Sequence, residues 1–298
     1  PKQYAGVLTT IARLAGLSDP KGRAQRAMSV ETAVAAGHLS TVESRDAKKT
    51  YNPRSWAQFT EQAPGIDWAA WRSGLGLRDD ALAQVVVAGP RSVSTAATVW
   101  TDMPIDTLRD YMRLNVLRSY ARYLSTPFRS AHFDFFSRTL NGVEQEPERW
   151  KSGVALVDSL LGEALGKKYV ARHFAGSAKD DARDLVANLV EAYRRSFASI
   201  TWFSDATRTE ANTKLDKLTV KIGYPDRWKD YSGLTIRADD VVESVRNGQM
   251  SAARREFAKL GTKVDKTEWQ MTPQTVNAYY DPTFNEIVFP AAILQYPF

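Results

Sequence analysis

A helical spacing of apolar residues runs through most of the first two hundred residues, and it limits the fold more than any other feature of this sequence. Between residues 181 and 200 the apolar side chains recur one, three and four positions apart, which places them in one stripe along a long helix. Residues 150–165 and 241–260 repeat this spacing, with Gly261 as the expected stop of the second. Ser18-Asp19-Pro20 has the capping side chain and the first-turn proline that begin a helix. The sequence therefore predicts a mainly α fold.

The pattern changes after about residue 218. Lys221–Asp226 has the composition of a turn. Further on, residues 275–280 and 286–289 are two short β-prone runs, separated by the turn formers of residues 281–285. We therefore expect a β-hairpin near the C-terminus.

This hairpin determines the predicted domain organisation. Two strands alone bury too little apolar surface to be stable, and the octet Ala291–Phe298 that follows is still mostly apolar. We expect either further chain or a partner to cover it. The prediction is a large helical lobe over residues 1–215 and the beginning of an α+β domain over residues 216–298.

The composition excludes several kinds of site. The chain has no Cys, which rules out a disulfide scaffold, a thiolate metal site and a Cys nucleophile. His38, His132 and His173 stand apart without ligand spacing beside them, and no His-Glu-x-x-His occurs, so we interpret all three as structural. The longest apolar run, Ile287–Leu294, has eight residues, against the roughly 20 that a membrane span needs. Pro1–Tyr4 has no signal-peptide pattern.

Arginines and tyrosines alternate between residues 108 and 129, a composition that can indicate nucleic-acid binding. On one helical wheel, however, Arg109 and Arg113 lie opposite Arg118 and Arg122, so no single basic stripe forms. Arg109 and Arg113 fall within the broad apolar arc, which leaves two alternatives, pairing in the core or pointing into a cavity. The net charge of +6 is a weak field for a chain of 298 residues. We expect no nucleic-acid partner.

Asn277 is the most informative polar residue of the predicted hairpin, because Asn is disfavoured in the middle of a strand. Its amide carries donors and an acceptor that suit the main chain of another extended peptide. A strand at a sheet edge offers unpaired N–H and C=O groups to such a peptide. The alternative is an Asn that satisfies its own turn. The residues alone favour neither.

Motifs along nearly the whole chain, in a consistent order, resemble the neprilysin and endothelin-converting-enzyme family of zinc endopeptidases. In its lack of Cys, the chain resembles bacterial members of that family. The motifs are Tyr51-Asn52-Pro53, Trp150-Lys151, Gly162-Glu163-Ala164-Leu165-Gly166-Lys167-Lys168-Tyr169-Val170, Lys221-Ile222-Gly223-Tyr224-Pro225-Asp226, Val264-Asp265-Lys266-Thr267-Glu268-Trp269, Val276-Asn277-Ala278-Tyr279-Tyr280 and the run from Asn285 to Gln295.

The resemblance implies a two-lobed enzyme, in which a helical lobe closes over a thermolysin-like catalytic lobe and encloses a cavity that admits peptides. The strand matching Asn277, Ala278 and Tyr279 is expected to bind the substrate main chain beside the zinc. Asn277 is expected to hold the backbone just after the scissile bond, and the Ala278 carbonyl to accept a substrate N–H. Ile293 and Phe298 are expected to help form the hydrophobic pocket for the side chain after the cleaved bond.

The resemblance also implies what these residues lack. The family's zinc helix, catalytic Glu and third zinc ligand lie beyond the segment matching Phe298, so we expect a fragment with no catalytic residue and no metal ligand, inactive by itself. Tyr296 stands where the family usually has Pro. The expected cofactor is zinc held outside this chain. The expected partners are peptide substrates and the rest of the catalytic lobe, in the same polypeptide or a second chain.

The family also works outside the cytoplasm, which implies a periplasmic or secreted protein. A function from another class stays open. In that alternative, the chain is a non-catalytic module that binds peptides or acts as a scaffold. Zinc content and chelator-sensitive peptidase activity distinguish the two hypotheses.

Overall fold

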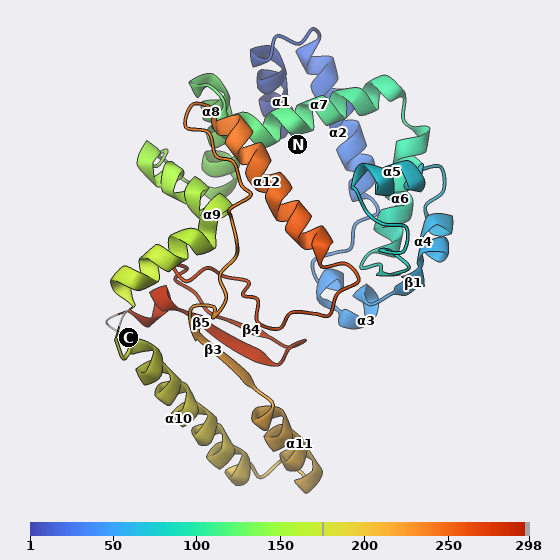
Figure 1. The fold of residues 1–298 in the computed structure, drawn as a ribbon. Coiled ribbons are helices and arrows are strands. Elements are labelled where there is room, and N and C mark those ends of the chain that lie inside the picture. The colour runs from blue at the N-terminus through green and yellow to red at the C-terminus, as the bar shows by residue number, and fades with distance from the viewer. Residues whose placement is uncertain (175, 296–298) are drawn as a thin grey trace. The chain divides into compact units, whose positions relative to one another are not determined.

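The computed structural model describes residues 1–174 and 176–295 (Figure 1). Helices dominate and the strands are few and short, so the expected mainly α fold is confirmed. The predicted lobes, residues 1–215 and 216–298, stay a prediction. By proximity the chain forms two compact units, Pro1–Pro147 with Arg237–Arg246 and Ala253–Thr262, and Glu148–Ile236 with Asn247–Ala252 and Lys263–Phe298.

Three helices form the core of the first unit, α1 (Lys2–Leu14), α2 (Pro20–Ala35) and α7 (Ile105–Tyr120). Small residues at the contact let these helices approach closely, and the buried cluster consists of Leu8, Ala12, Ala24, Ala27 and Leu114. The other elements of this unit are η1 (Glu43–Arg45), α3 (Ala47–Thr50), β1 (Pro53–Ser55), α4 (Trp56–Gln62), α5 (Trp68–Gly74), β2 (Gln84–Val86), α6 (Pro90–Asp102), η2 (Ala121–Tyr123), α8 (Thr126–Phe133) and the π-helical turn η3 (Asp134–Thr139).

The predicted start of α2 is confirmed. Asp19 is the N-cap, its carboxylate accepts a hydrogen bond from the Gly22 N–H at 3.1 Å, and Pro20 is the first helical residue. Arg109 and Arg113 are exposed, so their pairing in the core, one of the two alternatives, is wrong. The apolar residues on their side of α7, Ile105, Met112 and Val116, are exposed as well, so this side of the helix is not part of the core.

The predicted long helices are confirmed with shifted ends. They are α9 (Arg149–His173), α10 (Ala178–Ser199) and α12 (Val241–Ala258), and α11 (Asp205–Asp216) is added between α10 and the sheet strands. α9 is broken at Leu161, whose φ of −130° and ψ of 28° are not helical. Gly261 has a φ of +77°, in keeping with the expected stop after α12. None of the helices described is long and apolar enough to cross a bilayer.

The predicted hairpin is confirmed, but it belongs to a three-stranded sheet with the order β3-β5-β4. β5 (Glu286–Pro290) is central, and β4 (Tyr279–Asp281) pairs with it antiparallel. The third strand, β3 (Thr219–Gly223), is parallel to β5. The prediction of a turn over Lys221–Asp226 is therefore wrong for its first three residues. Extended structure at β3 depends on a pairing with residues far along the chain, which local turn chemistry does not reveal.

The first strand of the hairpin is shorter than predicted. It begins at Tyr279, so Thr275–Ala278 lies outside it. Two tight turns account for the difference. The Thr275 N–H donates to the Thr272 carbonyl at 3.0 Å, and the Asn277 N–H donates to the Thr275 carbonyl at 3.0 Å. A backbone occupied with these local bonds cannot continue the β-ladder.

The two faces of the three-stranded sheet carry different kinds of side chain. On one face Ala182 and Val186 of α10 pack against Ile222, with Phe289 and Leu294 beside them. Side chains alternate along each strand, so Lys221 and Glu286 belong to the opposite face. The sheet therefore has an apolar face under α10 and a second face with charged residues.

Candidate functional site

The outer edge of β4 is the candidate binding site. β5 occupies the other side of β4, and no strand among residues 1–174 and 176–295 pairs with its outer side. Asn277 and Ala278 immediately precede this strand, and the Asn277 side chain is exposed. An exposed sheet edge offers main-chain donors and acceptors to an added extended peptide.

One of the two polar atoms of the Asn277 side-chain amide is hydrogen-bonded to the adjacent backbone. Its Oδ1 accepts a hydrogen bond from the Ala278 N–H at 2.8 Å. Within the part of the chain that the structure describes, its Nδ2 has no hydrogen-bond partner and remains available as a donor. The local contact matches the turn-satisfying alternative, while the free Nδ2 keeps the peptide-binding prediction open.

The side chain of Tyr279 forms a hydrogen bond within the chain. Its hydroxyl accepts a hydrogen bond from the Gln270 N–H at 3.1 Å. Burial raises the pKa of this phenol, and the carboxylates of Glu286 and Asp281 act in the same direction, against the Gln270 hydrogen bond. The Tyr279 hydroxyl is therefore engaged with its own chain.

Ile293 lies in η4 (Ala291–Leu294), the short helical turn that directly follows β5. This turn is tied to the segment leading to Asn277, because the Ala292 N–H donates to the Pro273 carbonyl at 2.9 Å. Ile293 is half-buried. Phe298, the other predicted pocket residue, lies outside the described residues, as does Tyr296.

The sheet carries a buried charged pair, between β3 and β5, that sequence reasoning missed. Lys221 Nζ lies 2.7 Å from Glu286 Oε2, and the two side chains are only 10% and 2% exposed. Lys221 Nζ also donates to the Glu268 carbonyl at 2.8 Å. No local signal identifies this pair, since it forms only when β3 and β5 become neighbours.

Comparison of the sequence with known proteins shows its family. The profile of peptidase family M13 matches residues 1–225. The chain belongs to peptidase family M13. Two curated relatives are each 30% identical to it, neprilysin-3 of Drosophila melanogaster over 99% of this chain and neutral endopeptidase of Lactobacillus helveticus over 97%. The chain spans 40% and 45% of their lengths.

Solved structures agree with this membership. The Mycobacterium tuberculosis zinc metalloprotease ZMP1 in complex with an inhibitor has a TM-score of 0.91 and 43% identity, over all of this chain and 46% of the ZMP1 chain. PepO from Lactobacillus rhamnosis has a TM-score of 0.85 and 26% identity, over 99% of this chain and 47% of its own. The fold of these M13 residues is therefore that of known zinc-metalloprotease structures.

Two of the three histidines of this M13 chain lie beside aromatic rings. The His132 ring lies 4.7 Å from that of Phe136, and its pKa is lowered by burial first and by Arg122 and Arg118 next. The His173 ring lies 5.0 Å from that of Tyr169. Across residues 1–174 and 176–295, no group of three or more His, Cys, Asp or Glu side chains comes together to hold a metal. The described residues therefore do not fit a zinc ion.

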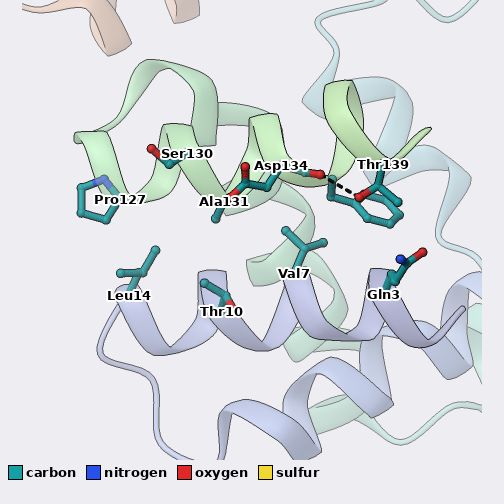
Figure 2. A pocket seen from close by; sticks show the side chains of 10 residues that line it. Gln3, Val7, Thr10, Leu14, Pro127, Ser130, Ala131, Asp134 and Thr139 are labelled. Carbon is teal, nitrogen blue, oxygen red and sulfur yellow. Dashed lines mark hydrogen bonds between the residues drawn. The ribbon is translucent and has the colours of Figure 1, made fainter. Parts of the chain in front are cut away.

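Grooves of similar volume are also found among the described residues, and one of them borders the hairpin. A groove of about 440 Å³ runs between α1 and α8 with η3, where Val7 and Thr10 face Ala131 (Figure 2). Its acidic group, Asp134, is paired with Arg138, and the Asp134 carbonyl accepts from Thr139 Oγ1 at 2.8 Å. A second groove of about 440 Å³ is lined by α10, α11 and the hairpin. Neither groove gathers groups for acid–base or nucleophilic chemistry.

Proposed function

We propose that these residues form the helical lobe and the substrate-binding edge of a zinc-dependent endopeptidase that cleaves peptides in an enclosed cavity. Membership of family M13 and the likeness to ZMP1 support this function. The single observation that carries the binding role is the edge of β4 beside the exposed Asn277, which no strand of residues 1–174 and 176–295 pairs with. The zinc ligands and the catalytic Glu are assigned to residues beyond Phe298, so the 298 residues alone are expected to be inactive.

In this proposal the residues present bind and orient, and none performs a chemical step. Asn277 Nδ2 donates to the peptide backbone just after the scissile bond, and the Ala278 carbonyl accepts a substrate N–H. Ile293, with Phe298, contacts the side chain that follows the cleaved bond. Holding an extended peptide in one register makes the later attack effectively intramolecular. The other partner is the remainder of the catalytic lobe, and the proposed location is periplasmic or secreted.

The test is Asn277→Ala in the complete polypeptide that carries this sequence. We expect kcat/KM for a peptide substrate to fall by a factor of about 10 to 1000, because the hydrogen bonds to polarised substrate groups are lost. Asn188→Ala, on the exposed surface of α10, is the matched control. An unchanged kcat/KM in the Asn277 variant removes this residue from the binding edge.

Binding without cleavage is the second candidate, and the free β4 edge supports it equally. It predicts that the complete polypeptide retains peptides but never cuts them, with or without a chelator. If the complete polypeptide contains stoichiometric zinc and cleaves peptides in a chelator-sensitive way, the endopeptidase hypothesis holds and the binding-only hypothesis fails.

A further inference from the structure

The segment Thr272–Gln274 leads directly to the proposed binding edge, and it is held from two sides. Pro273 is fully buried, and its carbonyl accepts from the Ala292 N–H at 2.9 Å. On the other side the segment lies against α9. The position of Asn277, three residues further on, depends on where this segment is anchored.

Two glycines of α9 allow the segment to approach closely. A Cβ on Gly162 would lie 2.7 Å from Thr272 Cγ2, and a Cβ on Gly166 would lie 2.8 Å from Pro273 Cδ. Carbon atoms in contact lie about 3.5–4.0 Å apart, so Ala at either position requires the Thr272 side chain or the Pro273 ring to shift. The contact with α9 is therefore specific to these residues.

Gln274 fastens the segment to α9 at the point where the helix is broken. Its Nε2 donates to the Asp158 carboxylate and to the Gly162 carbonyl, the second at 2.8 Å. Both partners only accept hydrogen bonds, so the orientation of the Gln274 amide is fixed. Asp158 and Gly162 lie on opposite sides of the break at Leu161. One side chain thus holds both halves of α9.

The same orientation has a cost. The Oε1 atom of Gln274 is buried, and no described residue donates a hydrogen bond to it. A buried acceptor without a donor costs about 1–3 kcal/mol. Stability alone does not favour such an arrangement, so the orientation of this buried amide calls for another explanation.

We propose that Gln274 is a positioning residue for the peptide-binding edge. It locks the segment Thr272–Gln274 to the two halves of α9 and thereby fixes where Asn277 meets the substrate backbone. Gln274 does not touch the substrate and acts through Asn277. The inference rests on the proposed function of the β4 edge.

The test is a double-mutant cycle in the complete polypeptide, with Gln274→Ala, Asn277→Ala and the combination. We expect Gln274→Ala to lower kcat/KM for a peptide substrate by about 10-fold to 100-fold, since a misplacement of about 1 Å has effects of this size. If Gln274 acts through Asn277, adding Gln274→Ala to Asn277→Ala changes kcat/KM by less than about 3-fold. The exposed Gln145→Ala is the matched control.

Multiplicative losses in the cycle overturn the inference, and so does an unchanged kcat/KM in Gln274→Ala. If Asn277→Ala alone has no effect, the proposed role of the edge fails first and the inference fails with it. Asp158→Ala removes the carboxylate that Gln274 binds, at a half-buried position of α9 where the helix tolerates Ala. It is expected to show the same non-additivity with Asn277→Ala, and it replaces Gln274→Ala if that variant does not fold.

Discussion

The buried pair Lys221–Glu286 gives the sharpest stability prediction. In Glu286→Gln the ammonium of Lys221 loses its carboxylate partner and keeps only neutral acceptors, among them the Glu268 carbonyl at 2.8 Å. Two unit charges 2.7 Å apart attract by about 6 kcal/mol at an effective dielectric constant of about 20. The Gln amide retains a hydrogen bond to Lys221, so we expect a loss of about 3–5 kcal/mol in the free energy of unfolding, the usual cost of breaking a buried pair.

The assay is urea unfolding of the 298-residue chain, followed by circular dichroism. In the double variant Glu286→Met with Lys221→Met we expect most of the loss to be recovered, because two apolar side chains of similar volume replace both charges. Glu191→Gln breaks the exposed pair with Arg195 and is the control, with an expected loss of less than about 1 kcal/mol. If Glu286→Gln loses no more than this control, the pair does not stabilise the sheet.

Two further predictions concern other parts of the chain. Because burial and then Arg122 and Arg118 lower the pKa of His132 from its usual 6.5, the protonated form favours the unfolded chain. The urea midpoint should therefore be constant above about pH 7 and fall as the pH drops through 6.5, and His132→Gln should flatten this dependence; an unchanged slope in the variant contradicts the assignment. Gly223→Ala should lower the free energy of unfolding by about 2 kcal/mol or more, since Gly223 has a φ of +80° and a Cβ there would lie 2.5 Å from the Phe174 ring; a midpoint equal to that of the parent chain refutes it.

The residues that sequence reasoning identified and those it missed differ in one respect. Asn277 was identifiable because its residue type conflicts with its local setting, and Asp19 because a cap acts within its own helix. Gln274 and Glu286 had no such signal. Their partners, in α9 and β3, lie far along the chain and come close only after folding.

The sequence by itself determined the helices, the hairpin and the family. Each of these follows from residues that are close along the chain, where the period of apolar side chains and the turn formers act directly. Tertiary structure alone decided that β3 lies beside β5, that β4 is the edge strand, and that Gln274 spans the break in α9. These features depend on which distant segments share the buried surface and the main-chain hydrogen bonds, and local composition does not encode that choice.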